Sequence, residues 1–319
     1  MKVLHSLDGL IEAKSIGLGF FDGIHLAHRE IIKNTVDLAR NNGVKSAIIT
    51  FEKSPFEVFG SASRCRHGEG DEPLMRDTAQ SGVSYITTNE QKTALIESLG
   101  VDYLYILDFS TIKNLSGEKY IEEILCKNFE PKFITTGFNH HFGINRSGSP
   151  TLLTNLASKF GYKYFEIPPQ KLENELISSS TIKKLIEQGD LKRANSFLGR
   201  DFEIEGEVQV GSKLGRTINF PTANLIWQEK IIKLPHGVYS GNVRVDGTTY
   251  KSLINWGSRP TVDNKSILEA HIIDFKDDIY GQKIAVSFEK KLRDIVKFEN
   301  LEELKRAIEK DYISIHPSR

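Results

Sequence analysis

The sequence predicts an α/β amino-terminal domain with a parallel sheet, followed by a small antiparallel β-barrel that ends in a helix. Three observations support this. The first half alternates short apolar runs with helical periodicity, closely spaced strand-like runs begin after residue 200, and helical periodicity returns only at residues 301–310. At roughly 100–200 residues per domain, a chain of 319 residues fits two domains. We expect the domains to be residues 1–185 and 186–319.

In the first half, each short apolar run is separated from the next by a longer amphipathic stretch. Strands are expected at residues 15–19, 47–51, 103–107, 133–136 and 163–167. Helices are expected at residues 26–42, 90–99, 117–127 and 151–160, three of which end at a glycine. This βαβ alternation is typical of a parallel sheet that is covered by helices on both faces.

Two short helices, at residues 181–188 and 191–198, are expected to join the halves. Beyond them, strands are expected at residues 202–210, 238–245, 248–256, 268–275 and 284–289. The dipeptide Asp246–Gly247 lies between two of these runs and predicts a tight hairpin. Short strands at this spacing favour a small barrel.

One stretch, residues 61–82, is polar and shows little periodicity. We expect a long surface loop there. Loops of that length are uncommon unless they are functional or disordered, so the segment is either an insertion without fixed structure or a lid over a substrate.

The composition excludes several classes of protein. Lys plus Arg and Asp plus Glu both number 42, so the zero net charge does not favour nucleic-acid binding. The two cysteines are far apart and form neither a metal-ligand spacing nor a disulfide framework. No signal peptide is evident at the start, and no apolar run approaches the roughly 18 residues of a membrane span. We expect a cytoplasmic protein without nucleic-acid or membrane partners, and its oligomeric state is not predicted.

The first motif is GLGFFDGIHLAH at residues 17–28, where the first strand meets the first helix. Ligands of open parallel sheets bind at the carboxyl ends of the strands, and a glycine-rich turn before a helix N-terminus suits phosphate. His25 and His28 lie three residues apart, on one face of the first helical turn, where two imidazoles can stabilise charge on a phosphoryl group. Alternatively, both are solvated polar residues at a helix start. The absence of a third ligand argues against zinc.

The second motif is GEVQVGSKLGRTINFPTAN at residues 206–224. Its glycines, with Lys213 and Arg216, are compatible with a phosphate-binding turn, and a basic hairpin turn is the alternative. Thr222 and Asn224 offer a hydroxyl and an amide oxygen, and hard oxygens of this kind suit Mg²⁺ that is carried by ATP.

Residues 19–28 resemble the GxFDGxHxGH motif of bacterial FAD synthetases, which are members of the HxGH nucleotidyltransferase superfamily. GFNHHFG at residues 137–143 resembles the loop that holds FMN and metal in that family, and ISSSTIK at residues 177–183 resembles its triphosphate-binding helix start, although serines there also cap helices. The resemblance implies a Rossmann-like domain that adenylylates FMN to FAD and releases pyrophosphate, with His25 and His28 as catalytic residues. It implies nucleotide contacts from Gly19, Phe20, Asp22, Gly23, Ser178, Ser179, Ser180 and Lys183, and places Asn139 on the FMN and metal side.

The second half resembles riboflavin kinase in the order and spacing of its motifs. These are GRTINFPTAN, LPHGVY at residues 234–239, NWGSRPT at residues 255–261 and EAHIIDF at residues 269–275. The whole chain is therefore similar to prokaryotic bifunctional riboflavin kinase/FAD synthetases, which implies that ATP also phosphorylates riboflavin to FMN. The resemblance implies that Glu269 is the base for the ribityl hydroxyl, that Thr222 and Asn224 hold Mg²⁺, and that Lys213 and Arg216 lie near the ATP phosphates. Taken alone, Glu269 could equally be a surface acid at the end of a strand.

The chain departs from the family pattern in four places. Ala27 replaces the glycine of HxGH, Lys53–Ser54 replace a proline and a histidine, Lys183 replaces an arginine and so loses its bidentate fork, and Asn219 replaces a glycine. Three of these departures fall in the adenylyltransferase domain. We expect both domains to act, with the adenylyltransferase the weaker. The alternatives are activity in one domain, foremost the kinase, or a flavin-binding regulator.

Overall fold

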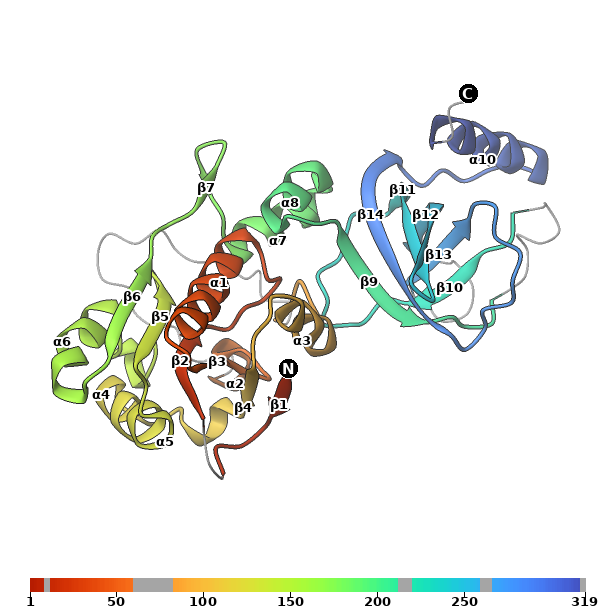
Figure 1. The fold of residues 1–319 in the computed structure, drawn as a ribbon. Helices are drawn as coiled ribbons and strands as arrows, with labels where there is room; N and C mark the ends of the chain where they lie inside the picture. The colour runs from red at the N-terminus through yellow and green to blue at the C-terminus, as the bar shows by residue number, and fades with distance from the viewer. Residues whose placement is uncertain (9–11, 60–82, 212–219, 259–265, 316–319) are drawn as a thin grey trace. The chain divides into compact units, whose positions relative to one another are not determined.

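The computed structural model describes residues 1–8, 12–59, 83–211, 220–258 and 266–315. Its contacts divide the chain into two compact units, Met1–Ser179 and Ser180–Arg319 (Figure 1). The expected loop at residues 61–82 lies outside the described residues, and so do Lys213 and Arg216. Within the described ranges, no helix is both long and apolar enough to cross a membrane.

The amino-terminal unit contains a six-stranded, fully parallel sheet in the order β1-β4-β3-β2-β5-β6. Its strands are β1 (Lys2–Leu4), β2 (Ala13–Leu18), β3 (Lys45–Phe51), β4 (Tyr103–Leu107), β5 (Phe133–Gly137) and β6 (Lys163–Ile167). The parallel sheet expected from the βαβ alternation is confirmed. The additional strand β1 is three residues long, which is too short to show a periodicity.

The direction of the strand order changes between β2 and β5. From β2 the chain moves through β3 to β4 on one side, whereas β5 and β6 lie on the other side of β2. The loops that leave the carboxyl ends of β2 and β5 therefore diverge and leave a crevice, which is where open α/β sheets bind their ligands.

Helices cover both faces of this sheet (Figure 1). They are α1 (Leu26–Asn41), α2 (Pro55–Phe59), α3 (Asn89–Ser98), α4 (Gly117–Lys119), the π-helix η2 (Tyr120–Cys126), α5 (Lys127–Phe129) and α6 (Pro150–Phe160), with short 3₁₀ turns η1 (Phe109–Thr111) and η3 (Ile144–Arg146) and a small hairpin of β7 (Lys171–Leu172) and β8 (Glu175–Leu176). Strand β3 shows the two faces directly. Ile48 packs in the cluster with α1 and α3, while Ala47 and Ile49 pack in the cluster with η2, α5 and α6.

The sequence predicted one α-helix over residues 117–127, and the structure inserts a π-helical turn into it. Tyr120 and Leu125 are five residues apart and both lie in the core. An α-helix at 3.6 residues per turn would separate them by about 140° around its axis, whereas the wider π turn brings such a pair closer to one face. The burial of both side chains accounts for the difference.

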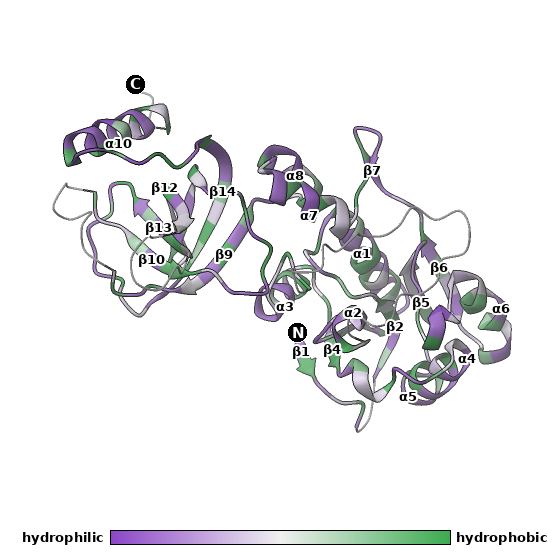
Figure 2. Ribbon diagram, turned by 180° about the vertical axis from the view of Figure 1, so that it is seen from behind, coloured by the Kyte–Doolittle hydropathy of each residue, from purple (hydrophilic) through white to green (hydrophobic). Residues whose placement is uncertain are grey.

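Helix α7 (Ser179–Gln188) starts at the last residue of the amino-terminal unit and continues into the carboxy-terminal unit. There it is followed by α8 (Leu191–Leu198) and a six-stranded antiparallel sheet in the order β10-β13-β12-β11-β14-β9. Its strands are β9 (Phe202–Glu207), β10 (Ala223–Ile226), β11 (Gly237–Val245), β12 (Thr248–Ser258), β13 (Ser266–Ile272) and β14 (Lys283–Arg293), and α10 (Leu301–Ile315) ends the unit. A bridge between Gln209 and Asn224 joins the two edges, so the sheet is a nearly closed barrel. In Figure 2 hydrophilic residues dominate α10, with apolar residues recurring along it.

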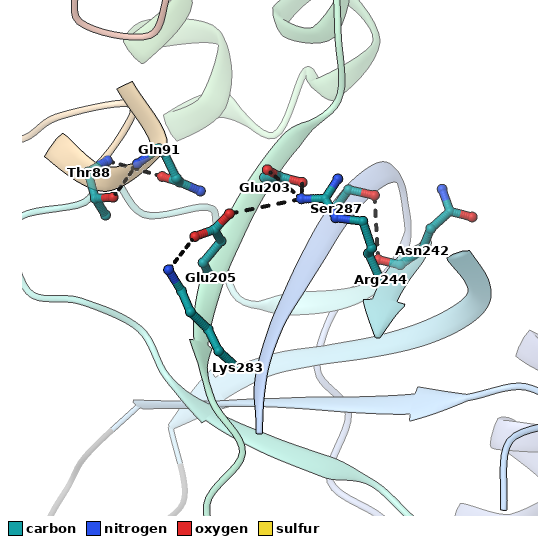
Figure 3. A network of polar contacts seen from close by, with 8 residues as sticks. All are labelled: Thr88, Gln91, Glu203, Glu205, Asn242, Arg244, Lys283 and Ser287. Atoms are coloured by element: carbon teal, nitrogen blue, oxygen red, sulfur yellow. Dashed lines mark hydrogen bonds and ion pairs between the residues drawn. The ribbon is translucent and has the colours of Figure 1, made fainter. Parts of the chain in front are cut away.

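The expected hairpin at Asp246–Gly247 joins β11 to β12. Both residues have positive φ, 47° and 81°, as the favoured two-residue hairpin turn requires. The outer wall of the barrel nearby carries paired charges (Figure 3): Arg244 lies 3.4 Å from Glu203, and Lys283 lies 2.9 Å from Glu205. These pairs are partly exposed and contribute little stability.

Candidate functional sites

The first candidate site is the turn between β2 and α1, at the carboxyl edge of the parallel sheet. Its backbone is tightly folded, with positive φ at Phe21, Gly23 and Ile24. Neighbouring segments hold the turn in place. The Thr50 hydroxyl donates to the Phe20 carbonyl at 2.8 Å, and Asp22 Oδ1 accepts from the Ile86 amide at 2.8 Å. Asp22 is thus a buried structural acceptor of this turn, rather than a side chain in open solvent.

His25 and His28 lie together, as the motif predicts. His25 is the N-cap of α1, its Nδ1 accepts from the His28 amide at 3.3 Å, and the two rings stack with centroids 3.6 Å apart. Because Nδ1 of His25 is an acceptor, the ring proton of His25 is on Nε2. Burial, followed by the charges of His25 and Lys92, lowers the pKa of His28 well below its usual range. His28 is therefore neutral at pH 7.

The serine-rich segment approaches the same turn. The Ser179 hydroxyl donates to the Asp22 carbonyl at 2.9 Å, which ties the start of α7 to the β2–α1 turn. Ser178 directly precedes this helix, and Ser180 and Lys183 follow within its first two turns. Of the predicted nucleotide contacts, the structure brings Ser179 directly against the histidine-bearing turn.

The loop after β5 carries Asn139, which is exposed. The loop begins against α1, because a Cβ on Gly137 would lie 3.3 Å from Ile31, and it closes through a bridge between Phe142 and Gly148. His140 stacks on Phe142, and burial lowers the pKa of His140 to about 4. The loops after β2 and β5 thus flank the crevice where the strand order reverses.

Lys92 on α3 also belongs to this edge of the sheet and was not predicted. Its ammonium donates to the carbonyl of Phe51, the last residue of β3, at 3.0 Å, and lies 4.8 Å from the centroid of the Phe20 ring. The signal was present in the sequence. Lys92 stands four residues before the fully buried Ile96, and residues four apart share one face of a helix.

The second candidate site is a row of polar side chains across three strands of the barrel. Glu269 on β13 is the direct register partner of Asn224 on β10 and of Asn255 on β12. Direct partners point to the same face of a sheet. The amide of Asn255 donates to the Glu269 carboxylate at 3.3 Å. Asn255 lies in the quoted NWGSRPT motif but was not among the predicted site residues, because only the strand register places it beside Glu269.

Contacts with the neighbouring backbone orient the side chain of Asn224 in the PTAN segment, residues 221–224. Its side-chain amide donates to the Thr222 carbonyl at 3.3 Å, and a Cβ on Gly211 would lie only 2.4 Å from the side-chain nitrogen of Asn224. The Pro221 carbonyl lies 2.8 Å from Nδ1 of His271, two residues beyond Glu269. Thr222 and Asn224 therefore lie beside the strand that carries the predicted base, while Lys213 and Arg216 are outside the described residues.

The same unit contains a cavity of about 550 Å³, and His271, two residues beyond Glu269 on β13, is among its lining residues. Its lining comes from the end of β13, the segment before β10, and one face of α10; Phe220, His271, Phe275, Tyr312 and Ile313 are among its residues. Its size falls within the ~300–1,000 Å³ typical of small-molecule sites.

Two family models match the chain, one described as FAD synthetase over residues 10–181 and one described as Riboflavin kinase over residues 198–316. The proteins named "Bifunctional riboflavin kinase/FMN adenylyltransferase" from Haemophilus influenzae and Bacillus subtilis are 31% and 32% identical to it. The alignments cover 97% and 94% of this chain and 95% and 91% of the relatives. The chain belongs to the bifunctional riboflavin kinase/FMN adenylyltransferase family.

The family assignment agrees with the motifs, and both halves of this bifunctional family member contain a candidate site. The FAD synthetase match includes the histidine turn and Ser179, and the riboflavin kinase match includes Asn224 and Glu269. A crystal structure named "Macrolide-efflux Protein" from Streptococcus pneumoniae superimposes with a TM-score of 0.82 at 26% identity, covering 99% of each chain. The two-domain architecture is therefore common to this chain and that structure.

Proposed function

We propose that the amino-terminal unit transfers AMP from ATP to FMN, and that the carboxy-terminal unit phosphorylates riboflavin. The observation that carries the proposal is the alignment of Glu269 with Asn224 and Asn255 in one row across the barrel. In this assignment residues 1–185 form the adenylyltransferase domain and residues 186–319 the kinase domain. The substrates are riboflavin, FMN and ATP, and we place the enzyme in the cytoplasm without a nucleic-acid partner.

In the adenylyltransferase reaction, a phosphate oxygen of FMN attacks the α-phosphorus of ATP, and the bond to pyrophosphate breaks. The N-terminus of α1 and the Nε2 proton of His25 favour the negative charge that develops on the phosphoryl oxygens. His28 is neutral and packs against the edge of Phe21, so its orientation is fixed before substrate binds. On the family pattern we assign the FMN side to Asn139 and nucleotide contacts to Gly19, Phe20, Asp22, Gly23, Ser178, Ser179, Ser180 and Lys183.

In the kinase reaction, Glu269 takes the proton of the ribityl hydroxyl as the oxygen attacks the γ-phosphorus of ATP and ADP leaves. Mg²⁺ fits the donors at hand. Thr222 and Asn224 supply hard oxygens, and this ion usually completes its shell with phosphates and water rather than a protein cage. Within the described ranges, we find no cluster of three or more His, Cys, Asp or Glu residues that could hold a metal ion by itself. Lys213 and Arg216 are assigned to the ATP phosphates.

We infer that the adenylyltransferase is the weaker activity. Ala27 adds a methyl group in the first turn of α1, where the nucleotide would pack. Ser54, in place of the family histidine, is buried and accepts from the Glu57 amide at 3.2 Å, so it serves as a helix cap for α2. Lys183 retains a charge without the fork of arginine.

The test is a product assay. Purified protein is incubated with riboflavin, ATP and Mg²⁺, and FMN is resolved from FAD by chromatography, under oxidising and under reducing conditions. We expect both products, with FAD accumulating more slowly. If FMN forms without FAD under both conditions, only the kinase is active. If neither product forms, the chain is a flavin-binding regulator. Chelation of Mg²⁺ is expected to abolish both reactions.

A further inference from the structure

Lys92 is a buried lysine at the carboxyl edge of the parallel sheet. Lys92 is only 3% exposed, which is unusual because lysine is rarely buried without a partner. A capping box between Thr88 and Gln91 fixes the start of α3 directly before it (Figure 3). The ammonium group is therefore held in one place by a rigid helix.

The charge of Lys92 has no direct ion pair within the part of the chain that the structure describes. Within the described ranges, its nitrogen has one hydrogen bond, to the Phe51 carbonyl, and no carboxylate within the 4.0 Å of an ion pair. A buried ammonium without a counter-ion costs several kcal/mol or loses its proton. Burial lowers the pKa of Lys92 to about 8, with the carboxylate of Asp22 opposing the shift. The group therefore remains mostly protonated at pH 7.

The position of this cation coincides with the candidate adenylyltransferase site. Its hydrogen-bond acceptor ends β3, and the aromatic ring beneath it belongs to the turn that follows β2. Its charge reaches His28, whose pKa it helps to lower. An anion bound at the N-terminus of α1 would meet the helix dipole, the histidines and this ammonium together.

We propose that Lys92 is a phosphate-binding residue of the adenylyltransferase site, whose ammonium contacts a phosphoryl oxygen of the bound nucleotide. The inference rests on the proposed function. An ammonium has three N–H donors, of which the Phe51 carbonyl takes one, so two are available for phosphoryl oxygens. The phosphate can belong to ATP or to FMN, which share this chemistry.

The experiment compares Lys92→Met and Lys92→Arg with the wild type and with Lys233→Met. Lys233 is a matched control in the other unit. Its pKa is also lowered to about 8 by burial, and it also lies over an aromatic ring, 5.2 Å from that of Trp227. FAD formation from added FMN is measured at varied ATP and at varied FMN. Binding is measured separately, as the thermal shift caused by pyrophosphate alone.

We expect Lys92→Met to lower kcat/KM for FAD formation by about 30-fold or more, the range for removing one partner of a desolvated charge pair. The pyrophosphate shift should disappear, Lys92→Arg should recover part of both, and Lys233→Met should leave FAD formation unchanged. Without ligand, Lys92→Met should unfold at the same urea concentration or a higher one, because an unbalanced charge is removed. A raised KM for ATP alone identifies the triphosphate as the ligand, and a raised KM for FMN alone identifies the FMN phosphate.

The proposal is overturned if Lys92→Met keeps kcat/KM within threefold of the wild type for both substrates. It is also overturned if the variant loses stability and keeps the pyrophosphate shift, since the lysine would then only anchor α3. Failure of the proposed function looks different, because the wild-type protein would then form no FAD under any condition.

Discussion

Asn224 and Glu269 stand directly opposite each other in the antiparallel ladder of β10 and β13. Side chains at such positions have Cβ atoms about 4.5–5.5 Å apart. The amide of one motif and the carboxylate of another, far apart in the sequence, are therefore first neighbours on one face of the barrel. The register makes them parts of one site and determines which substitutions should affect the kinase reaction alone.

Glu269→Gln should abolish FMN formation while FAD formation from added FMN continues. The amide keeps the shape of the carboxylate but cannot accept the ribityl proton, and loss of a general base typically costs 10²–10⁴-fold in rate. Both reactions are followed by chromatography of the flavin products. Glu207→Gln, which alters an exposed acid at the end of β9, should leave both rates unchanged. An equal fall in FAD formation would contradict independent sites.

Gly211→Ala should impair the kinase through Asn224. The added Cβ would lie 2.4 Å from the Asn224 nitrogen and force that side chain to move. Displacement of a positioning group by about 1 Å can cost on the order of 100-fold, so we expect kcat/KM of the kinase to fall between about tenfold and 100-fold. Gly206→Ala is the matched control, because its Cβ would meet the Leu225 side chain at 3.3 Å, which a small shift relieves. Wild-type kinetics in Gly211→Ala would argue against a role for Asn224.

Asp311→Ala should loosen α10 from the barrel. Asp311 is buried, and its Oδ2 accepts from Nε of Arg293, at the end of β14, at 2.9 Å and forms an ion pair with Nη2 at 2.9 Å. Removing one partner leaves a partly buried cation, which we expect to cost about 2 kcal/mol in free energy of unfolding. Both tryptophans of the chain, Trp227 and Trp256, lie in this unit, so tryptophan fluorescence during urea titration reports its unfolding.

The control for this substitution is Lys283→Met, which removes a partly exposed ion pair with Glu205 in the same unit and should change stability by less than about 0.5 kcal/mol. Since α10 and the end of β13 line the same cavity, Asp311→Ala should also raise KM for riboflavin. An unchanged urea midpoint would show that the ion pair does not hold the helix.

The amino-terminal unit should lose stability as the pH falls from about 6.5 to about 4. Burial lowers the pKa of His140 to about 4 and that of His28 in the same direction, so in this window the unfolded chain binds more protons than the folded unit. Unfolding is followed by circular dichroism. Both tryptophans lie in the other unit, so the transition of the amino-terminal unit is the one that tryptophan fluorescence does not report. His140→Gln should flatten this slope. A variant with the same slope as the wild type would exclude His140 as its source.

Local patterns in the sequence were enough for much of the fold. The alternation of apolar runs with helical periodicity predicted five of the six parallel strands, and Asp246–Gly247 predicted its hairpin, because strand and helix periodicity and turn preferences depend on neighbouring residues. The motifs with His25 and Glu269 identified where chemistry was expected. The π turn at Tyr120 was not predicted, because its cause is the core that Tyr120 and Leu125 share.

The composition of each site depends on contacts between distant segments. Lys92 looks like an ordinary surface residue of a helix until the ends of β2 and β3 lie against it. Asn255 joins Glu269, and Arg293 joins Asp311, only through the strand register and the packing of α10. Local sequence can specify which residues are helical or extended, but the pairing of strands and the burial of a charge are set by the free energy of the whole packed unit.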